Sequence, residues 1–252
     1  MDIDSYLDRI NYHGSRVPAA ETLRELQVAH LLAVPFENLS IHAKQPIVLE
    51  DAALFAKIVA GRRGGFCYEC NGLFAALLRA LGFEVTMLSA EVANAEGVFG
   101  PAFDHMTLMV SLDERWLVDV GFGDSFREPL RLAEPGEQQQ GNRCYQIHND
   151  GSVFTLMQKA DDGAWKAQYR FSLEPHEYAD YAEMCSFHQT SPQSHFTRAR
   201  LCSLATEKGR ITLSNMLFIT TSNNGEKREQ PVANETQYET ILRERFGIRM
   251  MS

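Results

Sequence analysis

Residues 62–71 read Arg62-Arg63-Gly64-Gly65-Phe66-Cys67-Tyr68-Glu69-Cys70-Asn71, and this stretch decides how the rest of the chain is interpreted. Cys67 follows a glycine pair and stands where an apolar-periodic helix begins, which we expect to run through Leu81. A helix N-terminus is electropositive, and two arginines lie within five residues of the thiol. We therefore expect a lowered pKa for Cys67 and a nucleophilic thiolate.

Two further interpretations of Cys67 are weighed against this one. It could be a half-buried thiol at a helix start, because cysteine is often a small buried residue. Together with Cys70 it also forms a Cys-x-x-Cys pair, as in thioredoxin-like sites. Such a site normally follows a strand, whereas helices are expected here, and no second cysteine pair completes a zinc site. A thiol–disulfide role stays an alternative, and no metal ligand is assigned.

Two downstream segments offer a base and an acid. His105 opens an expected strand at 105–111, and Asp119 lies in its expected hairpin partner at 116–120. If paired residue numbers sum to an even number near 224, the two side chains lie opposite on one face, with Cβ atoms about 5 Å apart. A one-residue slip would put them on opposite faces, and the turn at 112–115 leaves the register open. A carboxylate in the apolar run 117–122 is costly unless it is paired.

Other residues near the cysteine have expected roles of their own. Glu37 lies in an apolar turn, and we expect a partly buried, structural ion pair with Arg62 or Arg63. The backbone N–H groups of Gly65 and Tyr68 are candidate donors for an oxyanion, on proximity alone.

Composition limits the class of protein. The chain has 252 residues, 44% hydrophobic residues and a net charge of −9, which argues against general nucleic-acid binding. Five cysteines make no disulfide framework. We see no signal peptide and no apolar stretch near the roughly 20 residues of a membrane span. We expect a cytoplasmic protein with no nucleic-acid or membrane partner.

Hydrophobic periodicity predicts the α+β class, with helices first and antiparallel strands after them. The glutamine-containing stretch 136–141 is expected to be an exposed loop. We divide the chain into a helical domain at 1–82, a β domain at 83–190 and a short third region at 191–252. Helices are expected at 4–10, 20–32, 51–58, 71–81, 177–186 and 235–246, and strands at 83–93, 105–111, 116–120, 145–148, 152–159, 165–171 and 210–221.

The motifs together resemble the arylamine N-acetyltransferase family, in order and spacing, from the N-terminus to about residue 220. They are Pro35-Phe36-Glu37-Asn38-Leu39, the stretch 63–71, His105-Met106-Thr107-Leu108 and Val118-Asp119-Val120-Gly121-Phe122-Gly123. The resemblance implies a helical bundle, an antiparallel β-barrel and a C-terminal α/β lid, with a cysteine-proteinase-like triad. Carried onto this chain, the triad is Cys67, His105 and Asp119.

The resemblance also implies substrates. Acetyl-CoA would be the donor, as a co-substrate rather than a permanently bound cofactor, and an aromatic amine, hydrazine or hydroxylamine the acceptor, in xenobiotic metabolism. Gly123, Ser125 and Phe126 match the family's CoA-phosphate loop, while Phe36 and Phe122 match positions that line the acceptor pocket. Two departures stand out: the third region is short, and Asp124 puts a carboxylate where an anion should lie.

The predicted reaction is acetyl transfer by a ping-pong mechanism through an acetyl-cysteine. Several alternatives remain. The same triad serves thiol peptidases, transglutaminases and amide synthases, and another acyl-CoA could be the donor. A non-catalytic domain that keeps the fold would have an unreactive Cys67, and a thiol–disulfide protein would pair Cys67 with Cys70.

Overall fold

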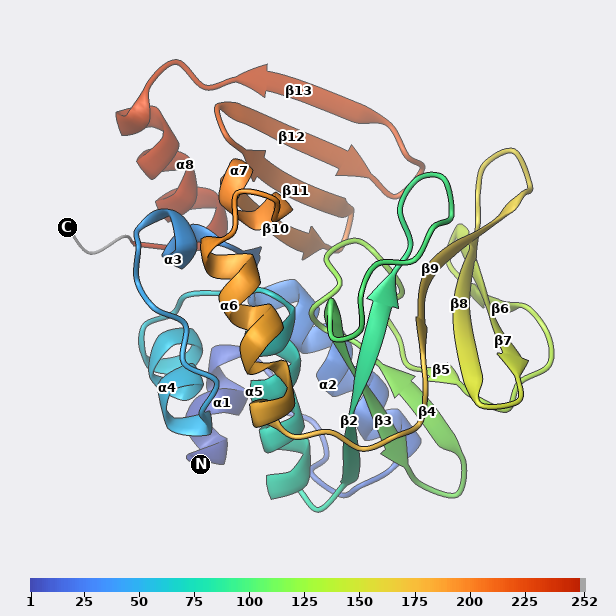
Figure 1. Cartoon of the computed structure of the whole chain (residues 1–252). Coiled ribbons are helices and arrows are strands. Elements are labelled where there is room, and N and C mark those ends of the chain that lie inside the picture. The colour runs from blue at the N-terminus through green and yellow to red at the C-terminus, as the bar shows by residue number, and fades with distance from the viewer. Residues whose placement is uncertain (250–252) are drawn as a thin grey trace.

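The computed structural model describes residues 1–249. Helices from the N-terminal third lie beside an eight-stranded antiparallel sheet, and a five-stranded sheet with the last helix lies across one end of both (Figure 1). The α+β class expected from the sequence is confirmed.

The N-terminal layer is built around one buried helix. This helix, α5, spans Cys67–Ala80, and its apolar residues recur at intervals of three and four, so that Leu73, Phe74, Leu77 and Leu78 are fully buried. It begins at Cys67, as expected from the position of the thiol, whereas the apolar periodicity alone placed the helix at 71–81. The other elements are α1 (Ile3–Arg9), α2 (Ala20–Ala33), α3 (Leu39–His42), α4 (Asp51–Phe55) and a π-helical turn η1 (Ala56–Ala60).

The larger sheet curls around an apolar interior. Its strand order is β5-β4-β3-β2-β9-β8-β7-β6, and every pair is antiparallel. Side chains from most of these strands, among them Tyr145, Leu156, Tyr169 and Phe171, fill one shared core. The strands are β2 (Glu84–Val92), β3 (His105–Ser111), β4 (Arg115–Val118), β5 (Leu130–Arg131), β6 (Gln138–Gln140), β7 (Arg143–Asp150), β8 (Val153–Lys159) and β9 (Trp165–Phe171).

The glutamine-rich stretch brings the two edges of this sheet together. The expectation of an exposed loop was wrong, because residues 138–140 form strand β6. The Gln138 amide exchanges two hydrogen bonds with the backbone of Arg131, at 2.8 and 3.0 Å. The Gln140 amide bonds the backbone of Arg127 and Glu128. Side-chain amides thus link β6 to the segment around β5, where the barrel is not closed by strand pairing.

The third region is a separate small sheet with a helix on it. The expected strand at 210–221 is in fact a hairpin, which turns at Asn215 with φ of 48°. The expected helix at 177–186 starts as a 3₁₀ turn, η2 (Tyr178–Tyr181), and continues as α6 (Ala182–Thr190). The remaining elements are α7 (His195–Arg198), β10 (Leu201–Thr206), β11 (Gly209–Ser214), β12 (Leu217–Ser222), β13 (Lys227–Pro231) and α8 (Glu235–Phe246).

Strand β1 (Phe36–Glu37) connects the N-terminal layer to this small sheet, because it pairs with β10. Three hydrophobic clusters fill the helical layer, the barrel and the small sheet. They support the three-part division, which stays a proposal; Tyr181 and Cys185, placed in the β domain, pack in the helical cluster. Among residues 1–249, no helix has the length and apolar character that a bilayer crossing requires.

Candidate active site

Cys67 occupies the first position of helix α5 and is almost wholly buried. The chain after strand β4 lies directly on it: a Cβ added at Gly121 would come within 2.8 Å of the Cys67 Cα and 2.9 Å of its carbonyl oxygen. Only glycine allows so close an approach of two backbones. This contact joins the loop that follows Asp119 to the start of the nucleophile's helix.

The expected depression of the Cys67 pKa is wrong for the resting protein. Burial raises the pKa of the thiol well above its ordinary value, and a hydrogen bond from the backbone of Met106 offsets only part of that effect. The arginines do not help, because Arg63 is engaged with Glu37 and Arg62 is exposed. A thiolate at this position therefore needs a positive charge to be formed near it.

His105 and Asp119 lie on the same face of the barrel sheet. Residue numbers paired across β3 and β4 sum to 226, as in Leu108 with Val118. The sum is even, which is the condition for one shared face, but it exceeds 224 by two: Thr107 comes opposite Asp119, and His105 is its diagonal neighbour. The diagonal is bridged by a hydrogen bond of 2.6 Å between His105 Nε2 and Asp119 Oδ2.

Asp119 is fully coordinated by the protein. Its Oδ1 accepts from Asn71 Nδ2 at 2.9 Å and from the Gly121 amide at 2.8 Å. Its Oδ2 accepts from the Tyr169 hydroxyl at 3.1 Å, besides the His105 ring. Burial by itself raises the pKa of this carboxyl, but the His105 ring, Asn71 and the Gly121 amide hold the pKa below its usual range. The group is therefore an anion, and its hydrogen bond to Nε2 fixes the orientation of the His105 ring.

Two of these donors were not identified from the sequence. Asn71 comes from the second turn of α5, where a polar residue in an apolar run was the available signal. It also donates to the Met106 carbonyl at 2.6 Å and accepts from the Val120 amide at 2.8 Å. Tyr169 lies in β9, a strand with the usual alternation of buried and exposed residues, and nothing in the sequence identifies it as a partner of Asp119.

Buried ion pairs hold the glycine-rich turn in front of Cys67. Arg63 Nη2 lies 2.7 Å from Glu37 Oε1, which confirms the expected pair and selects Arg63 over Arg62. Lys57 Nζ lies 2.7 Å from Oε1 of Glu69, whose Oε2 accepts from the Phe66 amide at 3.2 Å. These contacts tie β1 and η1 to the first turn of α5.

The two expected acceptor-pocket aromatics lie in different surroundings. The Phe122 ring packs against the His105 ring at 5.1 Å and the Tyr169 ring at 5.0 Å, between centroids. Phe36 lies farther along, 6.1 Å from the Phe196 ring, and both are partly buried. Phe122 thus borders the His105 imidazole directly.

In the loop 123–126, the burial of Phe126 argues against its expected contact with CoA. Phe126 is 2% exposed and packs on Tyr145 in the barrel core, so its side chain supports the loop from beneath. Gly123 has φ of +90°, a conformation that favours glycine, and a Cβ added there would meet no neighbouring atom. Ser125 is buried, and Asp124 forms ion pairs with Arg143 and Arg210.

Comparison with known proteins agrees with this geometry. Residues 19–252 match a family model described as N-acetyltransferase. A protein from Salmonella typhimurium, "Arylamine N-acetyltransferase / N-hydroxyarylamine O-acetyltransferase", is 34% identical over 98% of this chain and 88% of its own length. The chain belongs to the arylamine N-acetyltransferase family. The match extends to the last residue, beyond the expected limit near 220.

Further arylamine N-acetyltransferase relatives cover nearly the whole chain. "Arylamine N-acetyltransferase 1" of Homo sapiens is 32% identical over 99% of this chain and 95% of its own. A solved structure of the Mycobacterium marinum enzyme in complex with CoA superposes with a TM-score of 0.90 at 32% identity, covering 98% of this chain and 93% of that one.

Cys70 does not behave as the partner of a redox pair in this family member. Its sulfur donates to the Gly65 carbonyl at 3.1 Å, and all five cysteines are free thiols. Burial raises the pKa of the Cys70 thiol above its ordinary value, so the thiol stays protonated at neutral pH. The thiol–disulfide alternative is therefore not favoured.

Proposed function

We propose that this protein transfers an acetyl group from acetyl-CoA to the nitrogen of an arylamine, arylhydrazine or arylhydroxylamine, through an acetyl-Cys67 intermediate. The single observation that carries the proposal is the His105–Asp119 hydrogen bond of 2.6 Å, which lies close to the Cys67 helix because Gly121, two residues after Asp119, packs against the Cys67 backbone. Membership of the family supports the same reaction.

The first half-reaction begins with a proton. Asp119 holds Nε2 of His105, so Nδ1 is the ring nitrogen left to accept the Cys67 thiol proton. The resulting thiolate attacks the thioester carbonyl and forms a tetrahedral oxyanion. Collapse breaks the bond to the CoA sulfur, which leaves as a thiolate and takes the proton from His105. Burial of Cys67 makes this coupling necessary, because a lone thiolate is disfavoured there.

In the second half-reaction, an amine attacks the acetyl-cysteine. His105 Nδ1 accepts the proton that the nitrogen loses, and Cys67 is released as the leaving group and is reprotonated by the imidazolium. Phe122 borders the His105 ring, so a flat aromatic acceptor can stack there while its nitrogen faces the thioester.

One expected oxyanion donor is excluded by its hydrogen bonding. The Gly65 amide donates to the Pro35 carbonyl at 3.3 Å. Tyr68 remains a candidate, because its amide is in the first turn of α5, where N–H groups lack intrahelical partners. We propose the Tyr68 amide as a donor to the tetrahedral oxyanion.

The donor and the setting are proposed on separate grounds. The M. marinum structure with CoA supports a CoA thioester as donor, used as a co-substrate. A cytoplasmic setting is proposed on the sequence grounds given above, and neither nucleic acid nor membrane is proposed as a partner.

The test is intact-protein mass spectrometry after incubation with acetyl-CoA and no amine. One acetyl adduct is expected, mapped to Cys67, and it should disappear when 4-aminobenzoic acid or another arylamine is added. Cys67→Ala should abolish the adduct, whereas the matched change Cys70→Ala should retain it. A folded wild-type protein that forms no adduct, or an adduct that water removes as fast as the amine does, would contradict the proposal.

A further inference from the structure

One carboxylate beside the candidate triad has no role in the proposed mechanism. Asp104 directly precedes His105, and its side chain is 24% exposed. Within residues 1–249 its one ion pair is with His188, whose Nε2 lies 3.3 Å from Asp104 Oδ1. That contact lacks the geometry of a hydrogen bond, because Nε2 has no hydrogen-bond partner among the same residues. The carboxylate is therefore available to a donor on a ligand.

The imidazole that faces Asp104 is buried and uses only one of its two nitrogens. His188 is 5% exposed, and its Nδ1 bonds Ser194 Oγ at 3.1 Å. Its ring packs against the rings of Phe196 and Tyr68, at 5.1 and 6.0 Å between centroids. A buried ring nitrogen without a partner is costly and marks a place where a ligand atom would complete the structure. His188 Nε2 and the Asp104 carboxylate thus leave hydrogen-bonding capacity unused at the same place.

The backbone that carries Asp104 is held in a fixed conformation. Phe103, the residue before it, has φ of 63°, in the left-handed region that residues other than glycine rarely adopt. The Tyr68 hydroxyl donates to the Phe103 carbonyl at 2.6 Å, and the Phe103 amide donates to Ser89 Oγ at 2.8 Å. Such a conformation persists only where its surroundings hold it, and it is typical of functional sites. The segment that sets the direction of the Asp104 side chain is therefore fixed on both sides of Phe103.

Asp104 and His188 lie next to both proposed reacting residues. Asp104 adjoins His105 in the chain, and the His188 ring packs on Phe66, the residue before Cys67, with 6.5 Å between centroids. Burial is the largest cause of the raised pKa of the Cys67 thiol, and among the charged groups Asp104 contributes most to it. Negative charge therefore acts at the place where an amine would attack the acetyl-cysteine.

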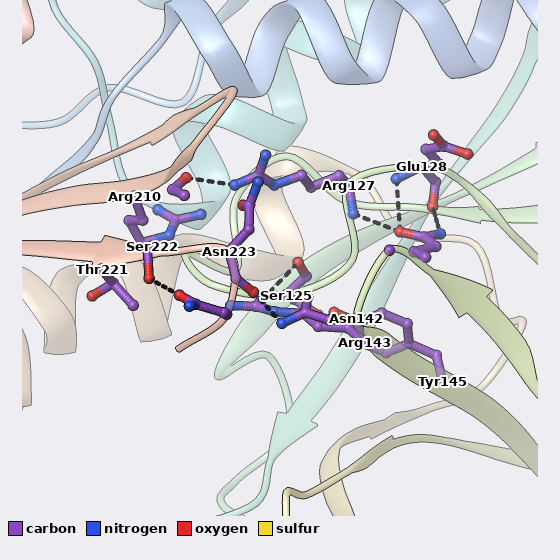
Figure 2. A pocket seen from close by; sticks show the side chains of 14 residues that line it. Ser125, Arg127, Glu128, Asn142, Arg143, Tyr145, Arg210, Thr221, Ser222 and Asn223 are labelled. Carbon is purple, nitrogen blue, oxygen red and sulfur yellow. Dashed lines mark hydrogen bonds between the residues drawn. The ribbon is translucent and has the colours of Figure 1, made fainter. Parts of the chain in front are cut away.

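Positive charge gathers at a different place. A recess of about 400 Å³ lies between the barrel and the small sheet, where strand β7 faces the β11–β12 hairpin (Figure 2). Its lining includes Arg127, Arg143 and Arg210. Neither Asp104 nor His188 belongs to that lining. The basic recess suits an anionic substrate, and the acidic position near the thiol suits a cationic one.

We propose that Asp104 selects the acceptor: its carboxylate binds a cationic group on the aromatic amine or hydrazine that attacks acetyl-Cys67. An ammonium or amidinium group donates to the Asp104 carboxylate, and it donates a further hydrogen bond to His188 Nε2 when the imidazole proton lies on Nδ1. An acceptor with a carboxylate substituent is repelled from the same place. The inference rests on the proposed acetyl transfer and concerns its second half-reaction alone.

The experiment compares three acceptors that share one ring and one amino group: 4-aminobenzamidine is cationic, 4-aminobenzamide is neutral and 4-aminobenzoate is anionic. The full chain is acetylated with acetyl-CoA, freed of CoA and mixed with each acceptor, and loss of the adduct is followed by mass spectrometry. Asp104→Asn keeps the shape of the side chain and removes its charge. We expect this variant to react about tenfold more slowly than wild type with the amidine, about tenfold faster with the benzoate and at a similar rate with the amide.

The first half-reaction and a matched variant serve as controls. Acetylation of Asp104→Asn by acetyl-CoA should be no slower than that of wild type, because a charge that disfavours the Cys67 thiolate is gone. Glu96→Gln removes an exposed carboxylate from the same β2–β3 loop, and it should match wild type with all three acceptors.

The pattern across the acceptors decides the outcome. If Asp104→Asn changes the rates with all three acceptors by the same factor, or changes none of them, the proposal is overturned, because a structural role alone does not distinguish charge. If wild type forms no adduct, the acyl transfer fails, and calorimetric binding of the three compounds tests the charge preference by itself. Wild type should then bind the amidine most tightly, and equal binding of the amidine by wild type and Asp104→Asn would overturn the proposal. Asp104→Ser takes the place of Asp104→Asn if that variant does not fold.

Discussion

Asn71 Nδ2 donates to Asp119 Oδ1 at 2.9 Å, and this bond links the helix of the nucleophile to the acid of the candidate triad. The same side chain bonds the backbone on both sides, at Met106 and Val120. One amide therefore sets the distance between α5, β3 and the end of β4. The three elements come from separate parts of the chain, so the triad's geometry depends on a residue that need not touch substrate.

Replacing Asn71 should disable the triad without removing any of its members. Asn71→Ala leaves the Met106 carbonyl and the Val120 amide without partners, and we expect a loss of about 2–4 kcal/mol in unfolding free energy. Asn71→Asp keeps the shape but sets a second carboxylate against Asp119, so acetylation at neutral pH should fall at least tenfold. Urea unfolding and single-turnover acetylation are the measurements. Wild-type acetylation by Asn71→Asp would show that this donor is dispensable.

Tyr169→Phe should alter the pH dependence of acetylation and preserve the fold. The ring packs in the barrel core, whereas the hydroxyl donates to Asp119 Oδ2 at 3.1 Å. Loss of that donor raises the pKa of Asp119, so the fall in acetylation rate on acidification should begin at a higher pH. Tyr12→Phe, the same change in the helical layer, is the control. If the acetylation rate of Tyr169→Phe falls at the same pH as that of wild type, the Tyr169 hydroxyl does not act on Asp119.

The fold class was predictable from the sequence, and the members of the candidate triad could be proposed from it, because both depend on local patterns. Helix α5 has three-and-four periodicity, and a carboxylate inside an apolar strand has to be paired. The register between His105 and Asp119 could not be predicted, because the turn at 112–115 admits more than one alignment of the two strands. The observed diagonal pairing follows from the sum of 226.

The errors concern long-range contacts that no local pattern encodes. The lowered pKa expected for Cys67 assumed that nearby arginines act on the thiol, but Arg63 is committed to Glu37, which lies 26 residues earlier. The exposed loop expected at 136–141 assumed that glutamines face solvent, yet Gln138 and Gln140 bond the backbone across the barrel seam. Tyr169 reaches Asp119 from another strand 50 residues on.

Gly121→Ala should separate the two halves of the active site. The new methyl group would lie 2.7 Å from Asn71 Nδ2 and 2.8 Å from the Cys67 Cα, so the loop or the helix must shift. We expect acetylation to fall by about a hundredfold, because small displacements of reacting groups are costly. Gly97→Ala is the comparison, since Gly97 has φ of +80° but no atom near its Cβ position. Equal activity of the two variants would refute the contact argument.

Glu37→Gln should destabilise the protein far more than it affects chemistry directly. The change leaves Arg63, which is 9% exposed, without its partner at 2.7 Å. Breaking a buried ion pair from one side costs about 3–5 kcal/mol. Asp4→Asn, which breaks the exposed pair with Arg16, should leave the urea midpoint nearly unchanged. A small loss in Glu37→Gln would contradict this expectation and would mean that neutral partners such as the Ser40 hydroxyl, 3.3 Å from Arg63 Nη2, suffice for the guanidinium.

Acid should unfold the protein partly through Asp119. Its pKa in the folded state lies below the ordinary value of 3.8, which the unfolded chain adopts, so unfolding takes up a proton between these two values. The stability that Asp119 contributes is therefore complete above pH 3.8 and is lost as the pH falls through the folded-state pKa. Urea midpoints measured from pH 6 downward should fall in this window. The midpoint of Asp119→Asn should fall less steeply with pH, whatever its value at pH 6. A variant with the wild-type slope would show that other carboxylates carry the acid sensitivity, and Asp124→Asn, whose carboxyl pKa is also lowered, is the next to compare.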